Sequence, residues 1–335
     1  MKRLLTLVLF STLISINVVA QDFHLAQYDA PPLFLNPAMT GKFNGKYRLH
    51  AHYRTQWKVI STRPFTTGLI SFDKAFGKWA FGVQLINNNA GAGSYNVAGG
   101  LVSAAYTLPL TKDGNHQLSI GVHGGAFQKS VDYNKLTFET QYTVQNGGGF
   151  NTSLPSGENI GNAQTIVPDV NAGLLYFYGK EEARVNPFVG YTLFHINQPS
   201  ESFYNDKSNK LPMRHIGHVG VKYNLSESIQ LLPKAIYMNQ GNVNELLVSM
   251  VGHFYLKNMD SYIIFGPYYR TTLANQDAAV IELGGKFKDY IARVSYDINI
   301  STLKASTDGR GAFEISVTYI PKNRKPITVP NCPRI

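Results

Sequence analysis

Cysteine is almost absent from this sequence, because Cys332 is the only one among 335 residues. A single cysteine excludes an internal disulfide, so the chain must be stable without one. Charged residues make up only 16% of the chain, and the basic residues behind its net charge of +10 are spread out with no dense Lys/Arg run. A nucleic-acid partner would need a clustered basic face, so this distribution predicts none.

Long apolar runs are also lacking, except at the start. Lys2 and Arg3 precede an apolar run from Leu4 to Ile16, and Ala20 follows at a position suited to cleavage. This pattern predicts a secretory signal peptide over residues 1–20, since the run is shorter than the ~20 residues of a spanning helix. No later apolar run would span a bilayer as a helix, which leaves a soluble exported protein or a membrane β-barrel.

Recognisable catalytic motifs are missing as well. The sequence has no G-x-S-x-G, no H-E-x-x-H and no evident pair of catalytic carboxylates. The glycine-rich stretch QNGGGFN is followed by neither Lys-Ser/Thr nor a helical pattern, so it is not a phosphate-binding loop. We therefore expect no enzyme and no cofactor.

What the sequence does contain is aromatic residues and glycine, with 20 Tyr, 19 Phe and 30 Gly. This composition favours an all-β protein with many turns. Segments of period-two or strand-like character recur about fourteen times, near the 9 to 11 residues that a tilted strand needs to cross a bilayer. They are 45–57, 65–73, 78–88, 96–108, 117–129, 169–178, 185–195, 212–225, 229–239, 244–256, 262–270, 277–287, 290–298 and 311–320.

The connections between these segments differ in length in an ordered way. If the N-terminus is periplasmic, the odd connections face outward, and they include the long segment 130–168 and NQPSESFYNDKSNK. The even connections, such as KAFG and FKDY, are mostly short. Short periplasmic turns and longer outer loops are typical of an outer-membrane barrel, whereas a soluble exported β-sandwich has no reason to sort its loops. We predict a transmembrane outer-membrane barrel of about 14 antiparallel strands.

Side-chain alternation assigns the two faces of the wall. Trp79, Phe81 and Val83 share one parity and face lipid, while Ala80 and Gln84 share the other and face the lumen. Some segments, such as LLVSMVGHFYL, are apolar on both faces. Such segments indicate a lumen that is partly filled.

Two proline-rich segments flank the predicted barrel of residues 45–320. Residues 21–44 form an N-terminal arm or plug, and residues 321–335 form a periplasmic tail, because repeated prolines prevent a regular strand in both. Within the arm, Asn36, Pro37 and Gly41 restrict the backbone. We expect the arm to fold against the periplasmic mouth and bury Leu33, Phe34 and Leu35; the alternative is an exposed docking peptide.

The first predicted strand carries the most conspicuous polar face. Its even positions are polar, and they could bond a partner's carboxylates or carbonyls. The candidate partner-binding residues are this face, the end of the strand and the arm's turn: Asn36, Pro37, Arg48, His50, His52, Arg54, Gln56 and Trp57. A metal site on the two histidines would lack a nameable third ligand and would sit between two cations, so we predict no metal. A solvated lumen wall is the alternative role.

Several motifs occur together after the signal peptide. They are HLAQYDAPPLFLNPAMTG (24–41), YRTQW (53–57), SFDKAF (71–76) and GVQLINNNAGAGS (82–94), and the chain ends in CPRI. In these motifs the sequence resembles the PorP/SprF family, outer-membrane proteins of the type IX secretion and gliding machinery of Bacteroidetes. The resemblance implies a non-enzymatic outer-membrane barrel that contacts membrane lipid and periplasmic secretion components, and that delivers or holds a secreted surface protein such as an adhesin. A diffusion porin for small solutes is the alternative function.

Overall fold

A computed structural model of the chain describes residues 22–58, 63–91, 93–144, 147–158, 164–180, 183–204, 206–256 and 259–322. The predicted signal peptide and most of the predicted tail, with Cys332, lie outside these residues. Within the described ranges, no helix is both long enough and apolar enough to cross a membrane.

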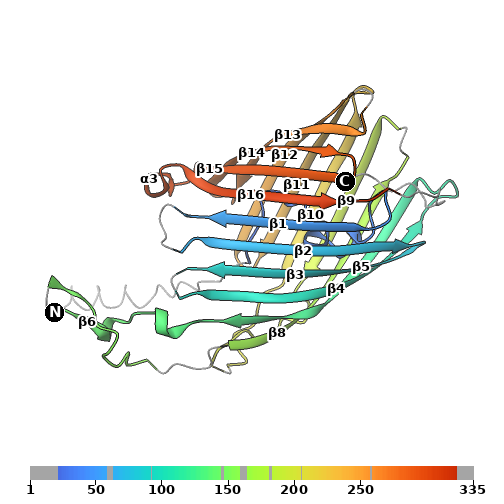
Figure 1. The fold of residues 1–335 in the computed structure, drawn as a ribbon. Coiled ribbons are helices and arrows are strands. Elements are labelled where there is room, and N and C mark those ends of the chain that lie inside the picture. The colour runs from blue at the N-terminus through green and yellow to red at the C-terminus, as the bar shows by residue number, and fades with distance from the viewer. Residues whose placement is uncertain are drawn as a thin grey trace, which may run out of the picture.

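The described chain forms a closed antiparallel barrel of fourteen strands, in which each strand pairs with its neighbours in sequence order (Figure 1). The barrel closes where the first and last strands pair, from Leu49 with Tyr319 to Gln56 with Ala312. The predicted all-β barrel and its strand count are confirmed. The strands are β1 (Arg48–Gln56), β2 (Phe65–Phe76), β3 (Trp79–Ala90), β4 (Tyr95–Pro109), β5 (His116–Ser130), β8 (Gln164–Tyr178), β9 (Val185–Phe194), β10 (Arg214–Asn224), β11 (Ile229–Gln240), β12 (Val243–Tyr255), β13 (Ser261–Thr271), β14 (Gln276–Phe287), β15 (Tyr290–Asn299) and β16 (Arg310–Tyr319).

The two faces of the wall follow the period-two pattern of the sequence. In β3 the side chains of Trp79, Phe81 and Leu85 are exposed on the outside, whereas Ala80 and Gln84 are buried inside. Closure pairs every strand on both sides, which leaves no open sheet edge in the lipid. The exposed apolar band is the surface that a bilayer would cover.

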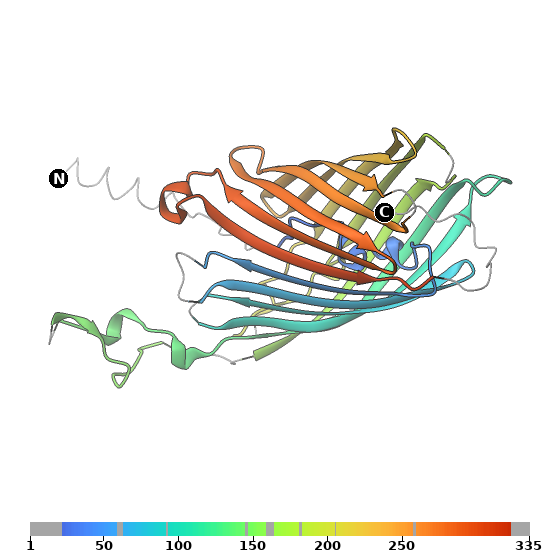
Figure 2. The same ribbon diagram turned by 45° about the horizontal axis from the view of Figure 1, so that its top comes forward.

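The connections define two ends of the barrel. At the end here called the short-turn end, β2 and β3 are joined by residues 77–78, and β14 and β15 by residues 288–289. At the opposite long-loop end, residues 131–163 join β5 to β8, and residues 195–213 join β9 to β10. The first of these long connections contains η2 (Tyr133–Lys135), η3 (Glu139–Gln141), β6 (Tyr142–Thr143) and β7 (Gly149–Phe150), and it projects away from the wall (Figure 2). The loop after β15 contains α3 (Lys304–Thr307).

The segment that precedes β1 lies inside the barrel (Figures 1 and 2). It contains α2 (Pro32–Leu35) and η1 (Pro37–Met39), each begun by a proline. α2 ends after four residues because Asn36, which precedes Pro37, has an extended backbone. Leu35 and Met39 pack in one apolar cluster with inward residues of β8 to β14, among them Leu247 and Val251. The segment LLVSMVGHFYL is therefore apolar on its inner face because the lumen is filled there.

Candidate functional site

The arm, described here from residue 22 to residue 44, runs along the lumen from one end of the barrel to the other. At the long-loop end, the backbone N–H of Asp22 donates to Gln240 Oε1 (2.8 Å), and Asp22 Oδ2 lies 2.7 Å from His195 Nε2. At the short-turn end, Lys42 Nζ donates to Thr107 Oγ1. The arm is thus not confined to one mouth of the barrel.

The turn at Asn36 is fixed by the hydrogen bonds of its side chain. Asn36 Oδ1 accepts from the backbone N–H of Ala38 (2.8 Å), as expected of an asparagine that begins a turn. Its Nδ2 donates to the backbone carbonyl of Leu174 (3.0 Å) and contacts His218 Nε2 (3.1 Å). The side chain is fully buried, so these partners replace the water that a buried amide loses.

Two glycines in the wall make room for this turn. A Cβ on Gly173 of β8 would lie 2.1 Å from Asn36 Oδ1, and a Cβ on Gly121 of β5 would lie 2.3 Å from the carbonyl carbon of Pro37. Both distances are far below a van der Waals contact. The arm and these two strands therefore fit only because those positions lack side chains.

Arg48 holds the arm at the short-turn end. It makes a bidentate pair with Asp73 of β2, from Nε to Oδ1 (2.9 Å) and from Nη2 to Oδ2 (2.7 Å), and Nη2 also donates to the carbonyl of Met39 (3.1 Å). Asp73 Oδ2 accepts in turn from the backbone N–H of Gly41 (2.6 Å). The buried pair thus binds the arm through both of its members.

Glu314 of β16 plays the same role further toward the long-loop end. Its two carboxylate oxygens accept from the backbone N–H groups of Ala26 (2.7 Å) and Gln27 (2.9 Å). His52 Nε2 lies 3.2 Å from Oε2, and Arg54 donates to Oε1. The cationic face of β1 is therefore paired with an acid of the neighbouring strand, and that acid binds the arm.

The remaining predicted site residues have separate environments. His50 Nδ1 lies 2.8 Å from Thr318 Oγ1, and Gln56 accepts from Arg54 Nη2 (3.1 Å). Trp57 has a φ of 60° and packs edge-on against Phe65. Pro37 begins η1 against the β5 glycine. The structure brings Arg48, His52 and Arg54 together with the arm, while Trp57 lies apart from it.

Sequence reasoning missed the acids on which this network depends. Asp29 of the arm accepts from Arg293 Nη1 (3.1 Å) and from Lys234 Nζ (2.5 Å), and Asp297 accepts from Arg270 Nη2 (3.0 Å). Burial acts to raise the pKa of Asp29, but Arg293 and Lys234 outweigh it and hold that pKa well below its usual range. A signal was available, because an acid on the inward parity of a barrel strand must find a partner.

One group of possible metal ligands occurs within the described residues, and it does not include His50 or His52. The ligand atoms of His24, Glu245 and Asp277 lie within 4.8 Å of one another. His24 Nδ1 is already 3.1 Å from Glu245, and Arg270 Nε donates to Asp277 (2.5 Å). Hydrogen bonds and an ion pair account for this cluster, and we assign no metal to it.

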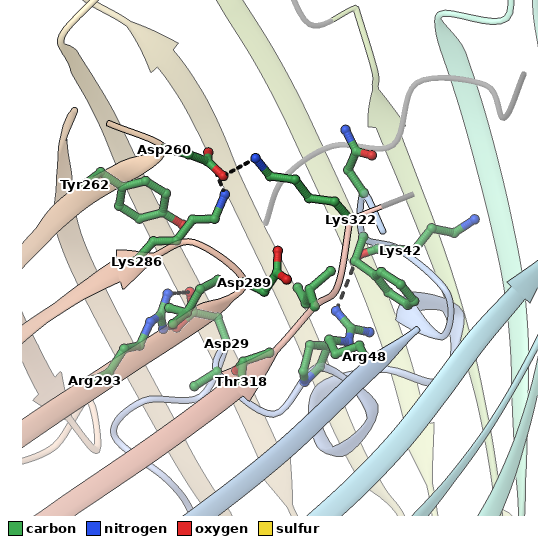
Figure 3. A pocket seen from close by; sticks show the side chains of 16 residues that line it. Asp29, Lys42, Arg48, Asp260, Tyr262, Lys286, Asp289, Arg293, Thr318 and Lys322 are labelled. Carbon is green, nitrogen blue, oxygen red and sulfur yellow. Dashed lines mark hydrogen bonds and ion pairs between the residues drawn. The ribbon is translucent and has the colours of Figure 1, made fainter. Parts of the chain in front are cut away.

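A polar cavity of about 340 Å³ opens at the short-turn end, beside the last residues of the arm (Figure 3). Asp260 lies on its rim and pairs with Lys286 Nζ (3.2 Å) and Lys322 Nζ (2.6 Å), and these hydrogen bonds lower its pKa, the Lys322 bond most. Lys322 follows β16, so this contact ties the segment directly after β16 to the turn between β12 and β13. Lys42, Arg48 and Arg293 also line the cavity, as do the acids Asp29 and Asp289, so five basic residues face three acidic ones in its wall.

Comparison with solved structures identifies the architecture. The P. putida toluene transporter TodX is similar at a TM-score of 0.50 and 10% identity, over 87% of this chain and 93% of that chain. The CymD monoaromatic hydrocarbon channel is similar at 0.50 and 10%, over 88% and 94%. A deltaS2 mutant of TodX gives 0.52 and 12%, over 89% and 95%. At such identities the likeness concerns the fold alone.

Comparison with families is more specific. No curated protein sequence matches the chain. The model of the type IX secretion system membrane protein PorP/SprF, by contrast, matches residues 17–319, which include the arm and all fourteen strands of the described barrel. The chain therefore belongs to the PorP/SprF family of type IX secretion system membrane proteins, and its closed barrel lies in the outer membrane.

Proposed function

We propose that this protein is a non-enzymatic docking barrel of the type IX secretion machinery, which holds a secreted surface protein, such as a gliding adhesin, at the cell surface. Membership in the PorP/SprF family supports a role in secretion. The observation that carries the proposal is the arm, which occupies the lumen along its length and is fixed there by the Asp29–Lys234 ion pair and by hydrogen bonds to buried charged residues of the wall. A lumen filled in this way suits a scaffold better than a free diffusion path.

The orientation of the barrel follows from its connections. We place the short-turn end in the periplasm and the long-loop end outside, as in other outer-membrane barrels. On this orientation the long connections 131–163 and 195–213 face the secreted protein. The first contains mostly exposed residues, including Val144 and Phe150, which are available for contact with a partner.

The periplasmic partner would meet the basic cavity at the short-turn end. Lys286 and Lys322 lie at its rim, and both already bind the carboxylate of Asp260 (Figure 3). An acidic or carbonyl-rich segment of a periplasmic secretion component would form the same kind of charge-assisted hydrogen bond. We assign the docking of the machinery to this surface.

The predicted partner-binding residues contribute to this function through the arm. Arg48 and Asn36 bond the arm or the wall around it, and His52 and Arg54 hold the acid that binds its backbone. We propose that these residues keep the arm in the lumen, so that both mouths present fixed surfaces. His50 and Gln56 bond Thr318 and Arg54 and so support this network from the wall, whereas Trp57 lies apart from the arm.

Deletion of the gene tests the proposal. The deletion strain should lose a specific large protein from its surface, while its permeability to small solutes stays nearly unchanged. Surface biotinylation followed by mass spectrometry measures the first effect, and uptake of a small antibiotic or dye measures the second. Retention of every surface protein would contradict the docking role, and a fall in solute uptake alone would favour the diffusion porin.

A further inference from the structure

A second cavity, of about 250 Å³, lies inside the barrel at the long-loop end. The arm forms one side of it, where Phe23, near its start, and Phe34 of α2 stack with ring centroids 5.2 Å apart. The opposite sides come from β3, β4, β5, β8, β9, β10 and the connection 195–213, and they combine apolar residues with polar and charged ones. The apolar wall residues are Ile86, Val97, Leu101, Phe127, Val167, Phe194 and Leu211.

The acids that line this cavity are already paired. Asp22 and Asp169 contact the two ring nitrogens of His195, at 2.7 Å and 2.8 Å. Lys129 pairs with Glu201 in the same wall. The three carboxylates are thus matched by two cations that contact them directly.

Arg214, the third cation of the wall, is different. Its side chain is buried, with only 7% of the residue exposed. Within the described residues no carboxylate lies at ion-pair distance from it, and its one hydrogen-bond acceptor is Met238 Sδ, 3.0 Å from Nη2. A thioether is a weak acceptor, whereas a guanidinium offers five donors. The remaining donors therefore have room for an anion.

The surrounding charges favour a singly charged anion over a larger charge. Arg214 acts on Asp22 only through space: burial raises the pKa of that carboxyl, His195 lowers it, and Arg214 lowers it further. Once Lys129, His195 and Arg214 are counted against Asp22, Asp169 and Glu201, the wall carries no net charge, and a multiply charged ligand would meet three nearby carboxylates.

We propose that this cavity binds a small monocarboxylate with a compact apolar body, whose carboxylate pairs with Arg214 and whose body packs among Phe23, Phe34 and Phe127. The volume is slightly below the ~300–1,000 Å³ of sites for drug-sized ligands, so it suits a ligand with one ring or a short acyl chain. A planar guanidinium binds a carboxylate through two parallel hydrogen bonds, which fixes the orientation of the ligand. Because the arm forms part of the wall, an occupied cavity also holds the arm's first residues in place.

Calorimetric titration of the full mature protein in lipid nanodiscs with phenylacetate tests the proposal. Phenylacetate should bind, and its neutral analogue 2-phenylethanol should bind about tenfold or more weakly, as expected for loss of a charge-assisted hydrogen bond. Arg214→Gln should weaken phenylacetate to a similar degree and leave 2-phenylethanol unaffected. Arg310→Gln is the matched control, since Arg310 is largely exposed and lies outside this cavity.

Two further variants separate a binding defect from a folding defect. Arg214→Lys keeps the charge and should retain part of the affinity, and Phe23→Ala lies in the arm and should weaken both ligands while the barrel remains folded. Heat-modifiable migration in gels shows whether each barrel has formed. Equal binding of acid and alcohol, unchanged affinity in folded Arg214→Gln, or no binding of phenylacetate at millimolar concentration would each overturn the proposal.

Discussion

Arg48 and Asp73 show how single charges act in this lumen. Both side chains are almost fully buried, and each also bonds the arm. Breaking such a pair is more costly than its net contribution to stability, because the remaining charge stays buried without a partner. Arg310 and Asp308 form a contrasting pair, 3.7 Å apart and largely exposed, for which solvent screening leaves little net effect.

We predict that Asp73→Asn destabilises the barrel by about 3–5 kcal/mol, because Arg48 would keep its charge in a buried site. Urea unfolding in lipid vesicles, followed by tryptophan fluorescence, measures the change. Asp308→Asn is the control and should change stability by less than about 0.5 kcal/mol. Similar losses in the two variants would show that the buried pair has no special weight.

Gly121 gives a second prediction at the residue scale. A Cβ at this position would overlap the backbone of the arm at Pro37, whereas a Cβ on Gly124 of the same strand would meet nothing within 4 Å. Gly121→Ala should therefore push the arm from its seat and cost about 1–3 kcal/mol from overpacking. Limited proteolysis with N-terminal sequencing should show faster cleavage of the arm than in Gly124→Ala. Equal protection in both variants would mean that the arm tolerates the methyl group.

At the scale of elements, the arm is held in the lumen by burial of apolar side chains and by polar contacts. Leu33 and Leu35 are buried and contribute about 1.5–3 kcal/mol each through lost contact with water. Polar contacts fix its ends, and the contact at the long-loop end depends on protonation. Burial acts to lower the pKa of His195, but its hydrogen bonds to Asp169 and Asp22 raise it to about 9.

This shift predicts how pH affects the start of the arm. The pKa of His195 rises from 6.5 to about 9. Its contribution to the stability of the contact with Asp22 is therefore complete below pH 6.5 and is lost as pH rises through about 9. The pKa of Asp22 is lowered, so its contribution to the stability of this contact is present above the usual pKa of an aspartate and is lost only in strong acid. The other ionisable groups around this contact are Asp169, Lys129, Glu201, Arg214 and Tyr95.

A spin label at Phe23→Cys, with Cys332→Ser in the same chain, measures the release of the arm. Its mobility should rise between pH 8 and pH 10 in the otherwise natural sequence. In His195→Gln the label should be mobile already at pH 7 and change little with alkali. An alkaline transition that persists in His195→Gln would assign the effect to another group.

The whole molecule is a closed wall around an internal chain segment. Closure of fourteen strands leaves a lumen wide enough to need filling, and the arm fills much of it. Removal of residues 22–44 should therefore leave an open lumen. The barrel itself should still close, because β1 pairs with β16 and not with the arm. In planar bilayers the full chain should show no steady open channel, and the deletion variant should show one. Steady conductance by the full chain would support the diffusion porin.

Local patterns in the sequence predicted much of this architecture. Period-two or strand-like patterns of about ten residues identified the fourteen strands, and clean alternation identified the lipid face of segments such as β3, because strand geometry sets that period wherever the strand lies. The start of β8 was missed, since it begins at Gln164 and contains Pro168, a residue that cannot donate to the ladder. The apolar inner face of β12 correctly indicated a partly filled lumen.

The sequence by itself determined the strands, the faces of those with clean alternation, the lengths of the connections and the family resemblance. Each of these depends only on residues that are close together along the chain. Only the tertiary structure decided which charges meet. Arg54 and Glu314 are 260 positions apart, and Ala26 and Glu314 are 288 apart. Their contact depends on barrel closure, which brings the first and last strands together, and on the arm lying in the space enclosed. No local pattern specifies such partners, because strand register and closure are properties of the complete sheet.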